Sequence, residues 1–194
     1  TGIPFKYYND LYSWALNWAT KMRTFSWGNY TFGKDKIAVL KGGSMLNRGN
    51  FSPTTYFWKF LHNYYTIPIV NMTSESMDYH FNIIKKKRIE YIRGFPSALY
   101  TFANHLKNKS IQYSMKGVFT SAEMLYPYQR KVIEDVFETG ILDAYGCGDG
   151  MAGASQCELK NKYHINIETC YMEILYLDYK NEVKPGDEGI IVVT

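Results

Sequence analysis

Along most of the chain, segments with a helical spacing of hydrophobic residues alternate with short apolar runs. Between residues 7 and 25, apolar side chains recur at i, i+3, i+4 and i+7, which predicts an amphipathic helix. Short apolar runs that stop at glycine or polar residues predict strands, and longer segments with one apolar face predict helices. The expected strands cover residues 36–40, 66–70, 89–92, 116–120 and the run into Tyr145-Gly146, and the further expected helices cover residues 56–65, 76–87, 97–107 and 126–138.

The order of these elements predicts the fold class. Strands that alternate with helices form βαβ units, so we expect an α/β fold with a mainly parallel sheet flanked by helices. The pattern changes after Gly150, and the short strands expected there cover residues 164–168, 170–178 and 189–194. We therefore divide the chain into an α/β core over residues 1–150 and a β-rich extension of the same domain over residues 151–194.

Single residues refine these elements. Pro68 favours an edge position for its strand because proline cannot donate a ladder hydrogen bond. Pro96 suits the first turn of a helix, where its missing N–H is not needed. The cations of residues 85–88 follow an apolar helical segment, where the helix dipole favours positive charge.

Composition bounds the class of protein. The 194 residues are 46% hydrophobic, which suits one domain with a sizeable core. No run of 18 or more apolar residues exists, so no membrane span is expected, and no secretory signal is recognisable. Three cysteines, an odd number, argue against a disulfide framework and indicate a cytoplasmic protein.

Charge is distributed unevenly. From Glu134 onward the chain carries 12 acidic and 4 basic residues, whereas the first 133 residues carry 18 basic and 6 acidic ones. A basic half suits a phosphate-bearing ligand, although a solvated surface explains the excess equally well. Because no basic stripe alternates with stacking aromatics, nucleic acid is not an expected partner.

A glycine-rich stretch follows the last strand of the expected core. It reads Asp143-Ala144-Tyr145-Gly146-Cys147-Gly148-Asp149-Gly150, an apolar lead that breaks into a loop. Glycines allow the backbone to approach a ligand closely. The tyrosine offers a flat face to a base, and Asp149 offers oxygens to a metal ion or to hydroxyls. A plain turn between two strands is the alternative.

Three expected strand ends carry small or polar residues. They are Gly94-Phe95-Pro96-Ser97, Thr120-Ser121-Ala122-Glu123 and Tyr145-Gly146 with the following loop. Ligands bind at the carboxyl ends of strands in open parallel sheets, so we expect a nucleotide and metal site there. Each residue also has a structural alternative: Ser97 begins a helix, and Glu123 places negative charge near a helix N-terminus.

The same segments resemble a known family. The run Thr120-Ser121-Ala122-Glu123-Met124-Leu125, followed by Arg130, Ile133-Glu134, Phe137 and Tyr145-Gly146, is similar to the core of phenylacetate–CoA ligases. That branch of the adenylate-forming enzymes includes proteins encoded with capsule-polysaccharide genes. The matching markers continue in family order with Thr1-Gly2-Ile3-Pro4, Gly94-Phe95-Pro96-Ser97-Ala98-Leu99, Cys157, His164-Ile165, Glu173-Ile174 and Pro185-Gly186-Asp187-Glu188-Gly189.

The resemblance implies a two-step reaction. A carboxylic acid attacks the α-phosphate of ATP to give an acyl-adenylate, and a thiol such as that of coenzyme A then takes the acyl group. The implied partners are a small-molecule carboxylic acid and a nucleotide, and a homodimer stays open.

Site residues are implied one by one. The implied nucleotide-binding residues are Thr1, Gly2, Ser121, Ala122, Glu123, Tyr145 and Gly146. Asp149 replaces the glutamate usual in the family and would help to hold Mg²⁺. The implied substrate pocket comprises Phe95, Pro96 and Ser97.

Other family parts are not within the sequence. Most of the phosphate loop would precede Thr1, and the ribose-binding aspartate, the catalytic lysine and the small C-terminal domain would follow Thr194. We therefore expect a fragment of the large N-terminal domain that does not complete adenylation alone, and no catalytic residue is assigned. A non-catalytic nucleotide- or partner-binding module is the main alternative.

The late cysteines suggest a further alternative. Cys147, Cys157, His164 and Cys170 lie within 24 residues, and three thiolates with one imidazole form a known tetrahedral Zn²⁺ set. Their spacing lacks a close Cys-x-x-Cys pair, so small buried cysteines explain the pattern as well. Bound zinc would be structural, because four protein ligands leave no open position, and the protein would then be a zinc-stabilised domain.

Overall fold

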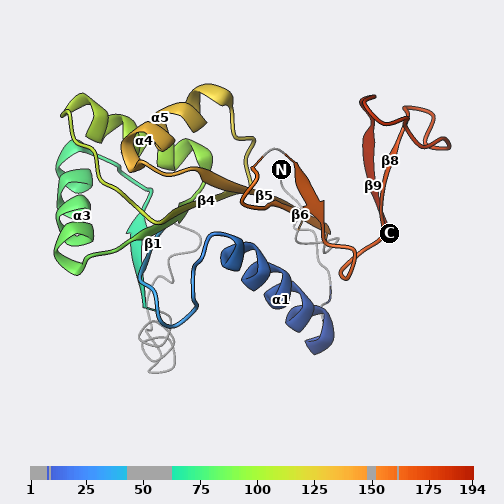
Figure 1. Ribbon diagram of the computed structural model, residues 1–194, viewed down its shortest axis with the longest axis horizontal. Helices are drawn as coiled ribbons and strands as arrows, with labels where there is room; N and C mark the ends of the chain where they lie inside the picture. Colours follow the sequence, from blue (N-terminus) through green and yellow to red (C-terminus); the bar gives the residue numbers. More distant parts are fainter. Residues whose placement is uncertain (1–7, 9, 43–62, 148–151, 161) are drawn as a thin grey trace.

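A mainly parallel sheet forms the centre of the protein (Figure 1). The computed structural model describes residues 8, 10–42, 63–147, 152–160 and 162–194. Seven strands lie in the order β2-β1-β3-β4-β5-β6-β7, with β1 to β5 parallel and β6 and β7 antiparallel. The strands are β1 (Ile37–Lys41), β2 (Tyr64–Pro68), β3 (Tyr91–Gly94), β4 (Gly117–Ser121), β5 (Ile141–Cys147), β6 (Ala152–Gln156) and β7 (Tyr163–Ile165). The expected α/β fold with a mainly parallel sheet is confirmed.

Helices cover both faces of this sheet. The described helices are α1 (Leu11–Trp27), α3 (Ser74–Lys87), α4 (Pro96–Asn108) and α5 (Pro127–Phe137). Figure 1 shows α3, α4 and α5 on one face and α1 alone on the other. Among the described helices, α1 is the one on this face of the sheet.

Local sequence fixes where these helices begin and end. The Asp10 side chain accepts a hydrogen bond from the Ser13 N–H at 2.7 Å and caps α1. Prolines occupy the first positions of α4 and α5, where a backbone N–H would have no partner within the helix. Lysines occupy the last turn of α3, as predicted from the basic run of residues 85–88. Arg88 ends the helix in the left-handed conformation.

Alternation along the strands separates two cores. Ile92, Val118 and Ile141 face the three-helix side, in a cluster of 19 buried residues. Their neighbours Tyr91, Phe119 and Leu142 face α1 and pack with Phe25 and Tyr30. Because successive side chains of a strand point to opposite faces, both cores come from the same short segments.

The α1 core is aromatic and tightly packed. The Phe119 ring lies 4.8 Å from the Phe25 ring, and the Tyr30 ring lies 5.2 Å from the Tyr91 ring, measured between centroids. A Cβ added at Gly28, which ends α1, would lie 2.6 Å from the Phe119 ring. Gly28 therefore lets the helix end approach β4 closely.

The C-terminal extension is β-rich, as expected, and it contains one additional strand. Strand β6 was not expected, because Ala-Gly-Ala-Ser-Gln lacks the branched and aromatic residues typical of strands. It is buried throughout, so small side chains suit it. Strands β8 (Met172–Leu175) and β9 (Ile190–Val193) form a separate antiparallel sheet that projects from the main body in Figure 1.

The expected helix over residues 56–65 is corrected at its end. Tyr64 and Tyr65 belong to β2, where aromatic side chains suit a pleated surface. Residues 56–62 lie outside the described part of the chain. Strand β2 is at the edge of the sheet, as Pro68 predicts.

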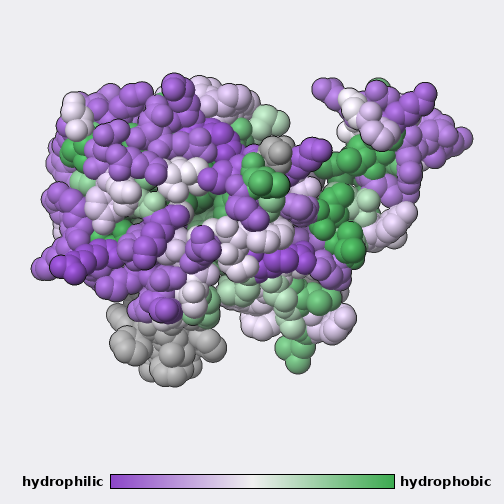
Figure 2. Space-filling model, in the orientation of Figure 1, coloured by the Kyte–Doolittle hydropathy of each residue, from purple (hydrophilic) through white to green (hydrophobic). Residues whose placement is uncertain are grey.

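The surface is polar over the three-helix side and apolar in places near the projecting hairpin. Figure 2 shows hydrophobic patches between the main body and that hairpin. Exposed apolar residues of this region include Ile167, Ile174, Leu177 and Ile191. Within the described ranges, no helix combines the length and apolar character needed to span a membrane.

Candidate functional site

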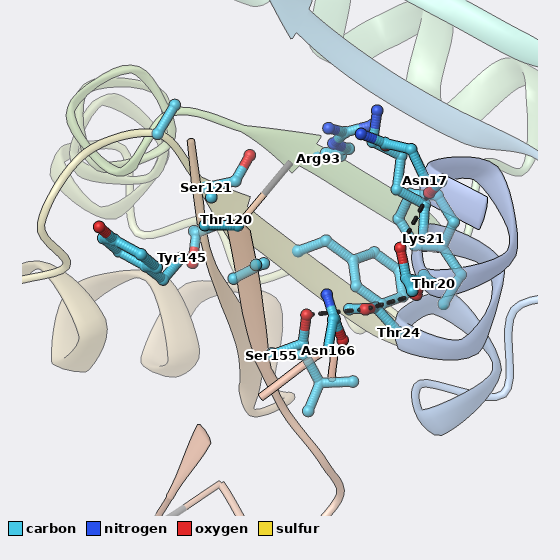
Figure 3. A pocket seen from close by; sticks show the side chains of 18 of the residues that line it. Asn17, Thr20, Lys21, Thr24, Arg93, Thr120, Ser121, Tyr145, Ser155 and Asn166 are labelled. Atoms are coloured by element: carbon cyan, nitrogen blue, oxygen red, sulfur yellow. Dashed lines mark hydrogen bonds between the residues drawn. The ribbon is translucent and has the colours of Figure 1, made fainter. Parts of the chain in front are cut away.

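A cavity of about 400 Å³ lies between α1 and the carboxyl ends of β4 and β5 (Figure 3). Its lining comes from α1, β3, β4, β5 and β6, and Asn166 completes it. This is the sheet edge where ligands of open parallel sheets bind. The volume falls within the range of about 300–1,000 Å³ typical of small-molecule pockets.

Hydrogen bonds fasten α1 over the sheet beside this cavity. The Thr24 hydroxyl donates to the Ser155 hydroxyl of β6 at 2.8 Å, and both side chains are buried. The Arg23 guanidinium donates to the Asn166 side-chain oxygen at 2.8 Å and also pairs with Glu168. The hydrogen bond from Arg23 to the Glu168 carboxylate holds the pKa of Glu168 below its ordinary value. Segments distant in sequence thus fix the position of α1.

Four of the residues implied by the resemblance line this cavity. Ser121 is the last residue of β4, Ala122 follows it, and Tyr145 and Gly146 lie in β5. Ser121 is in register with Ala144, so the two adjacent strand ends meet directly. The Tyr145 side chain is 44% exposed, which leaves its ring face available to a ligand.

Ala122 has an unusual backbone conformation. Its φ is 72°, in the left-handed region that a residue with a Cβ rarely adopts. Such residues persist where the surrounding structure determines them, often at ligand sites. Here the turn directs the chain from β4 past the cavity.

We expect Ala122→Val to lower the free energy of unfolding by about 1–2 kcal/mol, because a branched side chain resists a positive φ. Ala122→Gly should be neutral or slightly stabilising, since glycine adopts this conformation without a steric cost. Urea denaturation of both variants measures the difference. Equal losses in the two variants would contradict a backbone origin.

Glu123 and Ser97 come together, but not at the cavity. The Glu123 carboxylate accepts a hydrogen bond from the Ser97 N–H at 3.0 Å, in the first turn of α4. A carboxylate there satisfies a free N–H and suits the helix dipole. Glu123 is not one of the described residues that line the cavity.

The residues of the expected substrate pocket lie at the start of α4, and their role in substrate binding stays a prediction. Phe95 packs against the core of the three-helix side, Pro96 is buried at the start of α4, and Ser97 is exposed. None of these three is among the described residues that line the cavity. The strand end turns into a helix at this point, which directs their side chains into packing and capping. Thr1, Gly2 and Asp149 lie outside the described part of the chain.

The candidate zinc ligands are not gathered into one site. Across the described ranges, no group of three or more His, Cys, Asp or Glu side chains is placed to hold a metal ion. Cys157 is buried, Cys147 lines the cavity, and the His164 ring lies 5.2 Å from the Trp27 ring. Cys170 follows β7 on the way to the projecting hairpin. Proximity in sequence does not bring the four together, because strand and turn geometry separates them.

Sequence reasoning missed two basic residues of the cavity. Lys21 comes from α1 and Arg93 from β3. Burial lowers the pKa of Arg93, and burial together with the charge of Arg93 lowers the pKa of Lys21. An arginine directly after the expected strand of residues 89–92 was the available signal.

A buried polar network supports β5 from the opposite face. The Asp143 carboxylate accepts hydrogen bonds from the Thr120 and Tyr163 hydroxyls, and it is 5% exposed. Burial, and then the hydrogen bond to Asp143, raises the pKa of Tyr163 well above its ordinary value. The Gln156 side-chain oxygen accepts from the Asp143 N–H and from Arg130 of α5. The network ties β4, β5, β6 and β7 together behind the cavity.

Comparison with solved structures relates this fold to ligases that form acyl-adenylates. No protein-family model and no curated protein matches the chain. A 2-hydroxyisobutyryl-CoA ligase in complex with 2-HIB-AMP and CoA matches over 100% of this chain and 46% of its own, at 15% identity and a TM-score of 0.72. The same enzyme in a postadenylation state gives a TM-score of 0.73 at 14% identity, over 100% of this chain and 42% of its own.

Other solved structures share the fold less closely. MbtA of Mycobacterium smegmatis, in its apo structure, gives a TM-score of 0.57 at 13% identity, over 88% of this chain and 32% of its own. A long-chain-fatty-acid–CoA ligase from Archaeoglobus fulgidus gives a TM-score of 0.56 at 15% identity, over 92% of this chain and 38% of its own. At these identities the likeness establishes the fold. The chain spans less than half the length of each of these proteins.

Proposed function

We propose that this chain is the nucleotide-binding part of an ATP-dependent acid–thiol ligase. The whole protein would activate a carboxylic acid as its adenylate and pass the acyl group to a thiol such as coenzyme A. The observation that carries the proposal is the meeting of Ser121-Ala122 and Tyr145-Gly146 at adjacent strand ends, around one cavity.

Each residue would contribute binding and orientation. The Tyr145 ring would stack on the adenine, and the backbone of Ser121 and Ala122 would lie along its edge. The left-handed turn at Ala122 would keep that backbone in place. Fixing the nucleotide in this way would hold its α-phosphate still for attack by the carboxylate.

Finer parts of the proposal rest on sequence motifs. The order of the motifs supports the phenylacetate–CoA ligase-like branch, including its capsule-associated members. Thr1 and Gly2 would end the phosphate loop, and Asp149 would be a ligand of Mg²⁺, which supplies charge neutralisation on the phosphates. Glu123 would act indirectly, by fixing the start of α4 beside the turn at Ala122.

Nucleotide binding tests the proposal directly. We expect the 194-residue chain to bind AMP in a calorimetric titration, and Tyr145→Ala to weaken binding by about 10- to 100-fold through loss of stacking. Tyr171→Ala is the matched control, because Tyr171 is an exposed tyrosine (64%) that does not line the cavity. No AMP binding by the unmodified chain, or equal loss in both variants, would overturn the proposal.

A further inference from the structure

Two cavities meet beneath α1, and two cations lie at their junction. The second cavity, of about 340 Å³, shares Lys21, Phe25 and Arg93 with the first. Figure 3 shows the Lys21 and Arg93 side chains next to one another on one side of the first cavity, with Tyr145 on the other. The junction is therefore remote from the proposed adenine position.

Neither cation has an acidic partner in the described part of the chain. The ion pairs found there involve other residues, and no aspartate or glutamate is among the residues that line either cavity. The Arg93 guanidinium lies instead over the Phe25 ring, 5.5 Å from its centroid. Two neighbouring positive charges repel one another, and the burial of the Arg93 guanidinium adds a desolvation cost. A bound anion would offset both costs.

Arg93 lies deeper than the sheet edge that carries the proposed nucleotide site. It is in register with Phe119, two residues before Ser121 in β4. At about 3.3 Å per residue, its backbone lies about 7 Å further from that edge. A ligand that reaches both Ser121 and Arg93 must extend along the strands.

The second cavity is suited to a carbon skeleton. Its lining is mainly aromatic and aliphatic, from Trp18, Tyr30, Phe32, Ile37, Val39 and Tyr64. A third cation, Lys41, also lines it and lies over the Tyr64 ring. An anionic group there is attracted to both cations, Arg93 and Lys21, and water screens the half-buried Arg93 less than the exposed Lys21.

Resting on the proposed function, we propose that the acid activated here carries a second anionic group, a carboxylate or a similar oxyanion, bound by Arg93 and Lys21. The depth of Arg93 assigns the pair to the non-reacting end of the acid. The chemistry agrees, because cations on the attacking carboxylate would stabilise the ground state, and the carboxylate loses its charge on adenylation. Cations on the remote group interact with it equally before and after the reaction.

The test compares acids that differ only at their far end. Dicarboxylates from succinate to sebacate are titrated into the 194-residue chain by calorimetry, each beside the monocarboxylate with the same number of carbons. We expect at least one dicarboxylate to bind about 10- to 100-fold more tightly than its partner, the value of a charge-assisted hydrogen bond. Arg93→Gln and Lys21→Gln should each remove most of that preference.

Matched controls separate a specific site from overall charge. Lys131→Gln removes one cation from α5, where Lys131 pairs with Asp135 and lines neither cavity, and should keep the preference. In thermal denaturation without ligand, Arg93→Met should raise the melting temperature, because the variant no longer confines an unpaired cation. A lower melting temperature would indicate a structural role for Arg93 and overturn the inference.

Other outcomes also decide the question. Equal binding of paired acids, or no binding by any dicarboxylate, would overturn the inference, and AMP binding by the same chain would leave the proposed function standing. If Arg93→Gln reduces AMP binding to the level of adenosine, the pair binds the nucleotide phosphate, which again overturns the inference. Dicarboxylate binding without AMP binding would contradict the proposed function and retain the anion site.

Discussion

Phe119→Ala is expected to lower the free energy of unfolding by about 3–5 kcal/mol, as for other large aromatic residues removed from a core. The Phe119 side chain is 2% exposed and packs with the rings of Phe25, Tyr30 and Tyr91. Its loss would leave a void that neighbouring rings fill only in part. Denaturant-induced unfolding, followed by circular dichroism, measures the change.

The location of Phe119 adds a consequence for binding. The ring lies between α1 and β4 and also lines the cavity. Its removal should therefore loosen α1 and weaken AMP binding, beyond the loss of stability. Tyr79→Ala is the control, because Tyr79 is 63% exposed on α3 and should change stability by less than about 0.5 kcal/mol. A loss below about 1 kcal/mol for Phe119→Ala would contradict the packing described here.

The second large effect is expected at Asp143. Asp143→Ala should lower the free energy of unfolding by about 2–4 kcal/mol, because the Thr120 and Tyr163 hydroxyls would lose their acceptor. Thr120 is 2% exposed, so water does not readily replace the carboxylate. A gain in stability would show instead that the desolvation of the buried carboxylate exceeds the value of its hydrogen bonds.

A double-mutant cycle isolates the Tyr163 contribution. Tyr163→Phe alone should cost about 1.5–3 kcal/mol, the value of a hydrogen bond to a charged group. In the Asp143→Ala background, the same change should cost little, because the hydroxyl already lacks its acceptor. Additive losses would contradict a direct interaction between the two side chains.

The pH dependence of the Tyr163 effect follows from its raised pKa. An unfolded tyrosine loses its proton near pH 10, whereas folded Tyr163 keeps its proton to higher pH. Its contribution to stability is therefore fully present below about pH 10 and decreases as the pH rises further. The difference in stability between the unmodified chain and Tyr163→Phe should narrow above that pH.

Local signals in the sequence were sufficient for most of the core fold. The apolar spacing, with Pro96 at the start of one helix, predicts α1, α3, α4 and α5 within a few residues. Strand β6 was missed because its small residues have no strand preference of their own. Its burial between β5 and β7 comes from neighbours that lie on either side of it in the sheet.

The candidate site also combines features that local sequence predicts with features that depend on the fold. Ser121 and Tyr145 each lie near the carboxyl end of a strand, and the parallel order of β4 and β5 brings these ends to one edge. Glu123, in contrast, has a capping contact with Ser97 that depends on how α4 starts next to β4. Local sequence does not determine this choice between a ligand contact and a helix cap.

By itself, the sequence determined the alternation of strands and helices, the parallel core and the positions where polar residues follow strands. Those features depend on periodicity and on residues close together in the chain. Only the tertiary structure decided that α1 lies on the face opposite the other described helices and that Lys21 and Arg93 meet beneath it. It also decided that the candidate zinc ligands form no metal site within the described ranges. These arrangements arise from contacts between segments up to about 145 residues apart, such as the Arg23 and Glu168 pair, whose partners local spacing does not specify.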